Sequence, residues 1–340
     1  MKTFSEISNF LKNNSGRKLV GYGAGLATLQ TMRNVNFKLD YIVDDSKEIQ
    51  GQYLLDIPIK SPDYLMHFSK GSIFIIVFIY NNKALLTIQE KLSSWGFDYY
   101  QDWIDCSLLH FTTIKKRLQH ELNIQVDPDL FVRSRILSMY SPIKNLSSIA
   151  GTWLFEELLK KVCCSMQGNI AELGVYQGGN AFISNFLLWK TLQGRKYYLF
   201  DSFEGFPEFS FYDPQSRSDE FSDVSFSYVK NLFSAFKNIR IYRGLFSDTF
   251  KKVTSESFVF VYIDCDLYQP TLESCRFFYD RIKKGGIMLF HDYCGDEPDL
   301  PQGSKKPFTG VKKAVDEFFL DRTESIIEFP ETTHALIVKL

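Results

Sequence analysis

The chain has 340 residues, of which 45% are hydrophobic and 23% charged, a composition typical of a soluble globular protein with room for two domains. The formal net charge of −1 argues against a nucleic-acid partner and against a charged membrane surface as partner. The six cysteines include no Cys-x-x-Cys zinc pair, and we expect them to be reduced thiols without disulfides. An acidic residue in the N-terminal hexapeptide argues against a signal peptide, and the lack of a long apolar run argues against a membrane span. We therefore expect a cytoplasmic protein.

The first part of the sequence, residues 1–107, alternates strand and helix patterns. Strand patterns cover residues 18–22, 39–45, 73–80 and 97–100, and helix patterns cover residues 26–33 and 82–95. Such alternation is typical of a small parallel α/β domain. We therefore expect a Rossmann-like domain over residues 1–107.

A glycine turn, Gly21–Gly25, follows the first strand of this domain. A dinucleotide-binding fingerprint needs a small residue at its third position, but counting from either of the first two glycines places Leu26 or Thr28 there. Asp44 and Asp45 nevertheless stand where an acid would bind a ribose. We expect a degenerate nucleotide fold for acceptor handling or assembly. An NAD-dependent, sugar-modifying oxidoreductase and a module that docks onto a glycan-assembly partner are the alternatives.

Residues 108–147 are predicted to be a mainly helical linker. Asp127-Pro128 and Ser141-Pro142 interrupt it, because proline disfavours helix at the preceding residue. From Ser148 to Cys164 the apolar residues recur with helical spacing, which predicts a further helix. That helix could link the domains, cover the second sheet or form a dimer face, so a homo-oligomer stays open.

The last part, residues 148–340, begins again with strands. Strand patterns cover residues 169–175, 196–201, 239–244, 258–263 and 286–290, and segments 325–329 and 334–339 form a closing antiparallel pair. Five strands with intervening helices and a terminal hairpin are the order of the class I methyltransferase sheet. We therefore expect an α/β fold in which this doubly wound sheet follows the smaller Rossmann-like domain.

A second glycine turn, Glu172-x-Gly174-x-x-x-Gly178, lies between the strand at 169–175 and a helix. Glycine lets a backbone approach a ligand closely, and the helix N-terminus favours negative groups. The dinucleotide fingerprint fails because Tyr176 stands where it needs glycine. The spacing suits S-adenosylmethionine instead, with Asp201 at the end of the next strand placed to bind ribose hydroxyls.

Two neighbouring strand patterns end in polar side chains. The strand at 258–263 runs into Asp264 and Asp266, and the strand at 286–290 runs into His291 and Asp292. Because ligands bind at the carboxyl ends of strands in open α/β sheets, these side chains are candidates for chemistry. If the first strand continues, Asp264 and Asp266 point to opposite sides. The alternatives without a role in chemistry are a solvated turn for the two aspartates, a helix N-cap for Asp266 and, for His291, a core position in which its hydrogen bonds are made.

These segments resemble the macrocin O-methyltransferase family, which includes macrolide and aminocoumarin sugar O-methyltransferases. The motifs that carry the resemblance are Glu172–Gly179, Phe200–Pro207, Gly244–Thr249, Ile263–Tyr268 and Phe290–Tyr293, and they span roughly residues 148–340. The resemblance implies S-adenosylmethionine- and magnesium-dependent methyl transfer to a sugar hydroxyl of a glycan, nucleotide sugar or glycosylated metabolite. In such a site a cation lowers the pKa of the hydroxyl and a carboxylate removes its proton.

By this resemblance Asp264 and Asp292 are metal ligands and Asp266 is the general base. His291 stands where sugar-methylating members usually carry a second aspartate, and magnesium prefers oxygen ligands, so manganese, a water ligand or weak binding are the alternatives there. The candidate metal set is Asp264, His291 and Asp292. The candidate cofactor contacts lie in three of the motifs or directly after one of them: Glu172, Gly174, Tyr176, Gly178, Asn180, Asp201, Ser202 and Asp248.

The segment 203–227 between two strands is long for a βα connection and rich in aromatic and acidic residues. Long loops in compact domains are often lids or disordered segments, and its start at Asp201 favours a lid over the site. The acceptor and the position of methylation are not encoded in any motif that we recognise.

Overall fold

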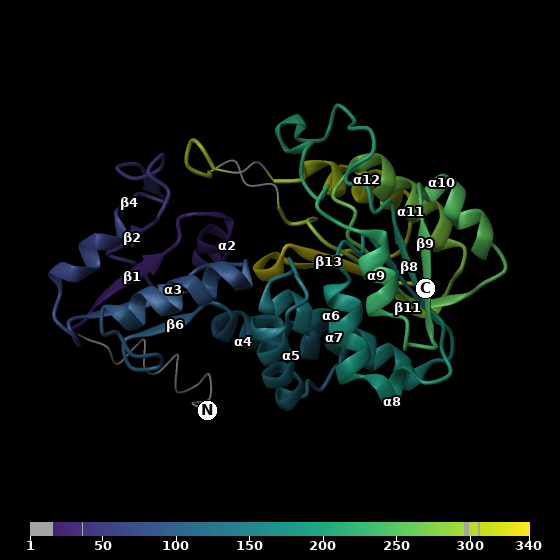
Figure 1. Ribbon diagram of the computed structural model, residues 1–340, viewed down its shortest axis with the longest axis horizontal. Helices are drawn as coiled ribbons and strands as arrows, with labels where there is room; N and C mark the ends of the chain where they lie inside the picture. The colour runs from purple at the N-terminus through teal and green to yellow at the C-terminus, as the bar shows by residue number, and fades with distance from the viewer. Residues whose placement is uncertain (1–15, 36, 296–298, 305–306) are drawn as a thin grey trace. The chain divides into compact units, whose positions relative to one another are not determined.

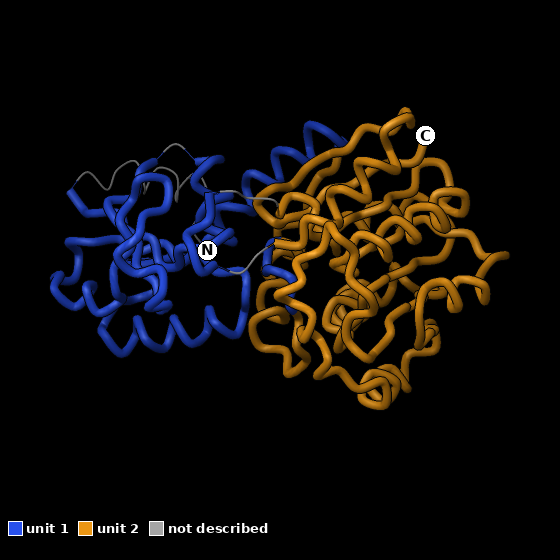
Figure 2. The backbone as a smooth tube through the Cα atoms, turned by 90° about the horizontal axis from the view of Figure 1, so that it is seen from above, with its two compact units in different colours: residues 1–123, 146–150, 297–305 blue, residues 124–145, 151–296, 306–340 orange. Residues whose placement is uncertain are grey.

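The computed structural model describes residues 16–35, 37–295, 299–304 and 307–340. The chain divides into two compact units, coloured separately in Figure 2. Unit 1 comprises residues 1–123, 146–150 and 297–305, and unit 2 comprises residues 124–145, 151–296 and 306–340. Residues 1–15, on which the expectation of no signal peptide rests, lie outside the described residues.

Unit 1 contains a six-stranded sheet in the order β3-β4-β2-β1-β5-β6. The strands are β1 (Lys18–Tyr22), β2 (Tyr41–Val43), β3 (Tyr53–Leu54), β4 (Ile57–Lys60), β5 (Ile73–Val77) and β6 (Trp103–Asp105). All pairs are parallel except β3 with β4. Its helices are α2 (Leu26–Asn34), α3 (Asn82–Ser94) and α4 (Ser107–Leu122), with a 3₁₀ turn at Pro62–His67. The predicted small α/β arrangement is confirmed.

Two local predictions for unit 1 were wrong. Residues 97–100 are not a strand; the edge of the sheet is β6, whose residues pair with β5 from Ile75 to Val77. The hairpin of β3 and β4 was missed because its turn, Leu55-Asp56, carries no glycine or asparagine although both residues have positive φ, 51° and 61°.

Unit 2 contains a seven-stranded sheet in the order β12-β13-β11-β10-β7-β8-β9. Its strands are β7 (Asn169–Leu173), β8 (Tyr197–Asp201), β9 (Ile239–Arg243), β10 (Phe258–Ile263), β11 (Ile282–Phe290), β12 (Ile327–Phe329) and β13 (His334–Val338). β7 to β11 pair in parallel, whereas β13 pairs antiparallel with both β11 and β12. The predicted α/β class with a doubly wound sheet and a terminal antiparallel hairpin is confirmed.

Helices cover both faces of this sheet (Figure 1). They are α5 (Pro128–Tyr140), α6 (Ile149–Ser165), α7 (Gly179–Leu187), α8 (Trp189–Leu192), α9 (Phe226–Leu232), α10 (Phe246–Thr249), α11 (Tyr268–Tyr279) and α12 (Thr309–Phe319). α5 begins at the predicted break, where Asp127 accepts hydrogen bonds from two backbone N–H groups and Pro128 occupies the first helical position.

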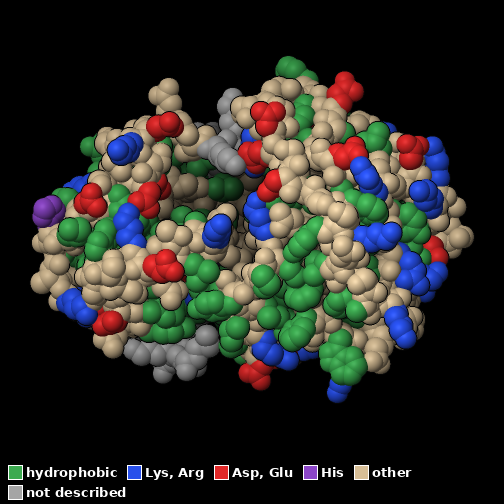
Figure 3. Space-filling model, viewed as in Figure 1, with side chains coloured by type: hydrophobic (Ala, Val, Ile, Leu, Met, Phe, Trp, Pro, Cys, Tyr) green, Lys and Arg blue, Asp and Glu red, His purple; other side chains and the backbone are tan. Residues whose placement is uncertain are grey.

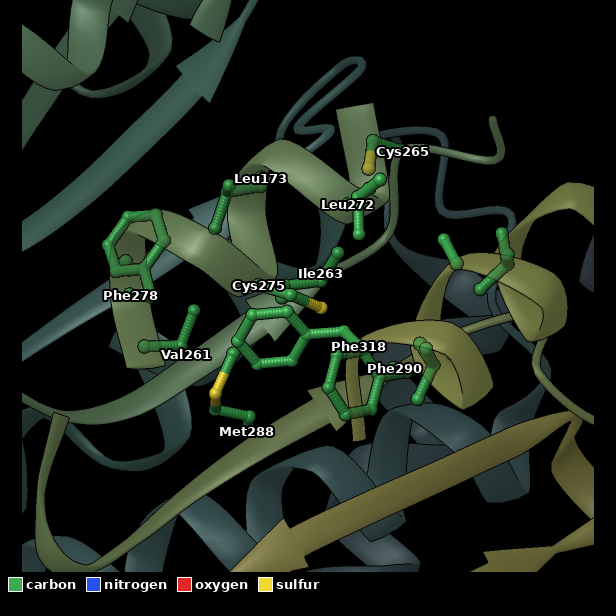
Figure 4. Packing of buried hydrophobic residues seen from close by; sticks show 14 of the residues in the cluster. Leu173, Val261, Ile263, Cys265, Leu272, Cys275, Phe278, Met288, Phe290 and Phe318 are labelled. Carbon is green, nitrogen blue, oxygen red and sulfur yellow. The ribbon is translucent and has the colours of Figure 1, made fainter. Parts of the chain in front are cut away.

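The alternation of β10 divides its side chains between two layers. Val261 and Ile263 belong to the hydrophobic core that contains α11 and α12 residues, shown close up in Figure 4. Phe260 and Tyr262 face the other way, and the ring of Phe155 on α6 lies 5.3 Å and 4.9 Å from theirs. Burial on both faces explains why β10 is apolar at every position.

None of the helices in the described part of the chain combines the length and apolarity that crossing a bilayer would require. On the face seen in Figure 3, acidic and basic side chains are interspersed among hydrophobic and uncharged ones. A mixture of both signs agrees with the formal net charge of −1 and keeps the local field weak.

Glu156 on α6 is a fully buried carboxyl group, and neither of its oxygens has a well-formed hydrogen bond to a described residue. Burial raises its pKa from 4.5 to about 8, against the weaker opposing effect of Ser134 on α5. The folded chain therefore keeps this proton at pH values where the unfolded chain loses it. The contribution to stability is fully present below pH 4.5 and is lost as the pH rises toward 8.

We expect Glu156→Gln to abolish this loss, because glutamine stays neutral at every pH. Relative to wild type, the variant should gain up to about 4 kcal/mol in unfolding free energy between pH 5 and pH 8. Urea denaturation at several pH values measures the difference, and Glu208→Gln in an exposed position is the control. Parallel pH curves for the Glu156 variant and wild type would contradict the prediction.

Candidate active site

The polar ends of β10 and β11 meet at one edge of the sheet of unit 2. The backbone N–H of Asp264 donates to the carbonyl of Leu173 on β7 at 2.8 Å, and the N–H of His291 donates to the carbonyl of Ile263 at 3.0 Å. These two bonds extend the parallel ladder one residue beyond the strands. They place Asp264 and His291 side by side, as the parallel pairing of their strands predicts.

The side chains of three of these residues are in direct contact. His291 Nδ1 lies 2.9 Å from an oxygen of Asp264 and 3.4 Å from an oxygen of Asp292. Nδ1 makes no aligned hydrogen bond with a described residue, so these contacts are charge interactions. Burial lowers the pKa of His291, but the carboxylates of Asp264 and Asp292 outweigh it and raise the pKa to about 10.

Asp266 completes the acidic cluster. Burial raises its pKa well above the usual value, and the charges of Asp292 and Asp264 raise it further. The strand does not continue to this residue: β10 ends at Ile263 and Asp266 has a φ of 62°, so the alternation of a strand does not separate Asp266 from Asp264. The alternative role as a helix cap also fails, since Leu267 is the N-cap of α11.

The donor atoms of this cluster, carboxylate oxygens and an imidazole nitrogen, are of the types that divalent cations bind. Three carboxyl groups face one imidazole, and the buried Nδ1 of His291 has no aligned hydrogen-bond partner in the described structure. As the side chains stand, however, no group of three or more potential ligands among the described residues is arranged to hold a metal ion. Metal binding would therefore need side-chain rotation.

Two buried residues, Tyr262 and His334, form a chain of polar contacts that ends at Asp264. The hydroxyl of Tyr262 donates to Asp264 at 3.1 Å and also lies 3.2 Å from Nε2 of His334 on β13. His334 Nδ1 lies 2.6 Å from the carbonyl of Thr332. Burial, followed by the charge of His291, lowers the pKa of His334 well below its usual value, so it is neutral. The hairpin thus contributes to the orientation of Asp264.

The glycine turn after β7 lies directly against the acidic cluster. Gly174 has a φ of 83°, and a Cβ added there would lie 1.8 Å from the backbone oxygen of Asp264. Only glycine permits this approach. Asp201 closes the turn from the other side, because its carboxylate accepts from the N–H groups of Val175 at 2.7 Å and Tyr176 at 2.8 Å. The predicted cofactor turn and the predicted acids therefore lie side by side at this edge of the sheet.

Residues 92–299, more than half of the chain, match the protein family described as macrocin O-methyltransferase (TylF). The chain belongs to the macrocin O-methyltransferase family. The resemblance expected from the sequence motifs is confirmed, and the family's region includes the glycine turn and the acidic cluster.

Similar proteins were found in two further comparisons. A Streptomyces olivaceus protein described as 8-demethyl-8-(2,3-dimethoxy-alpha-L-rhamnosyl)-tetracenomycin-C 4'-O-methyltransferase is 26% identical over 141 residues, 38% of this chain and 54% of that protein. The chain thus spans about half the length of this curated relative. Among solved structures, the O-methyltransferase NovP is 20% identical over 69% of this chain and 99% of its own, with a TM-score of 0.49. The calicheamicin methyltransferase CalS11 is 19% identical over 63% of this chain and 94% of its own, with a TM-score of 0.46.

Three further candidate cofactor residues of this macrocin O-methyltransferase family member differ in their solvent exposure. Glu172 is buried within β7, where its carboxyl accepts from the hydroxyl of Tyr197 at 2.6 Å and burial raises its pKa to about 8. Asn180 is in the first turn of α7, beyond the N-cap Gly178. Asp248 on α10 is exposed and forms an ion pair with Lys251, and no interaction described for it reaches the glycine turn.

The long segment after β8 packs over this part of the site. Ser202 donates its hydroxyl hydrogen to the carbonyl of Gly205, and the N–H of Phe203 donates to Asp201 at 2.6 Å. Some of its aromatic side chains pack inward, since the ring of Phe206 lies 5.0 Å from Phe221 and 5.6 Å from Phe308, whereas Phe211 and Tyr212 are exposed. Packing within unit 2 therefore accounts for part of the aromatic richness of the segment.

Sequence reasoning missed Lys144, which reaches the glycine turn from the connection between α5 and α6. Its ammonium donates to the hydroxyl of Tyr176 and lies 3.2 Å from Asp223, near the end of the long segment. Tyr176 itself donates to Asp223 at 2.7 Å. No motif surrounds Lys144, so only the fold reveals this contact.

The glycine turn of unit 1 is held by an acid in the same way as that of unit 2. Asp44 accepts from the N–H of Ala24 in the turn at 2.7 Å and from the N–H of Ser46 at 2.8 Å, so its carboxylate, like that of Asp201, binds local backbone. A Cβ at Gly23 would lie 2.6 Å from the carbonyl oxygen of Phe78, which explains this glycine by packing. Neither feature requires a nucleotide.

Proposed function

We propose that this protein is an S-adenosylmethionine-dependent O-methyltransferase that acts on a sugar hydroxyl. The observation that carries the proposal is the close approach of Gly174 to Asp264, which puts a cofactor-type glycine turn beside a partly buried cluster of acids. A methyl donor on the turn would then lie next to carboxyl groups that can take a proton from an acceptor.

The cofactor is proposed to bind over the turn between β7 and α7. Gly178 is the N-cap of α7 and offers no capping side chain, and the N-terminus of a helix favours a negative group such as the cofactor carboxylate. Asp201 already accepts hydrogen bonds from Val175, Tyr176 and Phe203, and its carboxylate retains capacity for a ribose hydroxyl. Ser202 begins the segment that covers this position.

Asp266 is proposed to take the proton from the acceptor hydroxyl. It lies beside Asp264 and Asp292, and their charges favour its protonated form. A divalent cation, Mg²⁺ or Mn²⁺, is proposed to bind between Asp264 and Asp292 with His291 as the third ligand. When bound, such an ion lowers the pKa of a coordinated hydroxyl and favours the ionised form of neighbouring carboxyl groups.

The acceptor class follows from the family and from the named sugar methyltransferase to which the chain is similar. We propose a sugar hydroxyl on a nucleotide sugar, a glycan or a glycosylated metabolite. The test is a panel of nucleotide sugars and rhamnosylated compounds incubated with the protein and methyl-labelled S-adenosylmethionine, with and without Mg²⁺ and Mn²⁺. Label in none of the sugars would refute the proposal.

The alternative functions of unit 1 are those of an NAD-dependent oxidoreductase and of a docking module. Isothermal titration with S-adenosylmethionine and with NAD separates the first from a methyltransferase. Binding of NAD without binding of S-adenosylmethionine would exclude the proposed function.

We expect Asp201→Ala to weaken S-adenosylmethionine binding by about 1–3 kcal/mol, the scale of a hydrogen bond to a charged group. Binding free energy is lost for two reasons. The variant has no carboxylate to accept from the ribose hydroxyls, and its glycine turn loses the hydrogen bonds that Val175 and Tyr176 donate to Asp201. Calorimetric titration measures the effect, and Asp280→Ala at the exposed end of α11 is the comparison. An unchanged dissociation constant in folded Asp201→Ala would remove Asp201 from the cofactor site.

A further inference from the structure

The segment between β8 and α9, residues 202–225 and here called the β8–α9 loop, contains one buried carboxylate, Asp213, whose side chain holds the loop to two helices. One oxygen of Asp213 accepts from the N–H and the hydroxyl of Ser210, at 2.8 Å and 2.5 Å, within the loop. Its other oxygen accepts from the N–H of Tyr268 at 2.8 Å.

The bond to Tyr268 gives α11 a cap that its own sequence lacks. Tyr268 is the first residue of α11, and its N-cap, Leu267, has no side chain able to accept a hydrogen bond. A carboxylate at this position also interacts favourably with the helix dipole. Because Asp266 lies two residues before Tyr268, the loop is attached immediately beside the acidic cluster.

The opposite side of the contact is formed by α12. A Cβ at Gly310 would lie 2.1 Å from the carboxylate oxygen of Asp213 that binds Tyr268, so glycine is needed for the carboxylate to enter. The hydroxyl of Thr309 donates to the carbonyl of Tyr212 at 3.0 Å, next to Asp213 in the loop. The rings of Tyr212 and Tyr268 lie 4.8 Å apart.

We propose that Asp213 is a positioning residue for methyl transfer: its carboxylate docks the β8–α9 loop onto the N-terminus of α11 and thereby forms the acceptor side of the active site. This deepens, and rests on, the proposed function. The loop is attached separately to the cofactor turn through Asp223, which binds Tyr176 and Lys144. Loss of the Asp213 contact should therefore free the acceptor side and leave the cofactor side attached.

Two substitutions disturb this contact from opposite sides. Asp213→Ala removes the carboxylate, whereas Gly310→Ala fills the space that the carboxylate occupies and also places a Cβ 2.8 Å from the backbone nitrogen of Tyr268. Because both variants lose the carboxylate contact, the double variant, which keeps the clash with Tyr268, should be less impaired than the sum of the two single effects. Asp213→Asn keeps an oxygen for Tyr268 but loses an acceptor for Ser210, so an intermediate effect is expected. Asp219→Ala, an exposed acid in the same loop, is the control.

The first measurement is proteolysis, which needs no acceptor. Arg217 is the only lysine or arginine in the loop, and it is held by Glu220 at 2.8 Å and by the ring of Phe308 at 3.5 Å. We expect trypsin to cut after Arg217 roughly tenfold faster in Asp213→Ala and Gly310→Ala than in wild type or Asp219→Ala. Equal rates in all four proteins would overturn the docking role.

The second measurement separates the acceptor from the cofactor. With the sugar that wild type methylates fastest, kcat/KM for the acceptor should fall about 10²-fold, because small displacements of positioning groups cost that much. The dissociation constant of S-adenosylmethionine should stay within about twofold, since Asp223 shares none of the hydrogen-bond partners of Asp213. Unchanged kcat/KM would overturn the positioning role. If wild type methylates no sugar, the proposed function fails, and proteolysis alone decides whether Asp213 holds the loop.

Discussion

Replacing Asp266 with asparagine is expected to lower the turnover number roughly 10²–10⁴-fold, because a positioned general base contributes about that much to a proton transfer. Asparagine has nearly the same shape as aspartate, so S-adenosylmethionine binding should change little. Burial and the charges of Asp292 and Asp264 raise the pKa of Asp266, and a base must be unprotonated to act. Wild-type activity should therefore rise with pH, and that rise should be lost in the variant.

Variants of the neighbouring residues distinguish a base from a metal ligand. Asp264→Asn and Asp292→Asn should weaken Mg²⁺ or Mn²⁺ binding and turnover together, whereas Asp266→Asn should leave metal binding nearly intact. His291→Asp should shift the preference toward Mg²⁺, because carboxylate is the harder ligand. Asp280→Asn, at the far and exposed end of α11, is the matched control. Full wild-type activity in chelator would refute the metal role, while normal turnover by Asp266→Asn would refute the base.

Replacing Gly174 with alanine is expected to destabilise the chain by on the order of 3 kcal/mol or more and to abolish cofactor binding. The added Cβ would lie 1.8 Å from the backbone oxygen of Asp264, and backbone cannot move aside as a flexible side chain can. The φ of 83° adds strain for any residue with a Cβ. Relief of the clash must separate β7 from β10 at the site where cofactor and acids meet.

Substitution of a second glycine, Gly194, distinguishes the energetic cost of the steric clash from that of the backbone strain. Gly194 has a similar φ of 76°, but a Cβ there would meet no atom within 4 Å. Gly194→Ala should therefore cost only the backbone strain, about 1 kcal/mol, and should bind S-adenosylmethionine normally. Thermal unfolding and calorimetric titration of both variants supply the comparison. Equal stability of the two variants would show that the close approach of Gly174 to Asp264 has no energetic consequence.

Local sequence pattern was sufficient for the strands of the second sheet. The apolar run of β10 marks a strand buried on both faces, and the break at Asp127-Pro128 marks the start of α5. The acids at the ends of β10 and β11 could be placed at one edge because parallel strands end on the same side. Where local signals were absent, prediction failed, as at the Leu55-Asp56 hairpin turn, where two residues other than glycine adopt positive φ.

The sequence by itself determined the α/β class, the glycine turn and the acidic edge, because each depends on neighbours in the chain or on the direction of a strand. Only the tertiary structure decided what each carboxylate contacts. Asp266 lies with Asp264 and Asp292 because the chain leaves β10 at Ile263 and turns through a positive φ. Asp213 reaches Tyr268, 55 residues away in the sequence, because the absence of a side chain at Gly310 leaves room for it. Contacts at such separation depend on packing, for which a local pattern carries no signal.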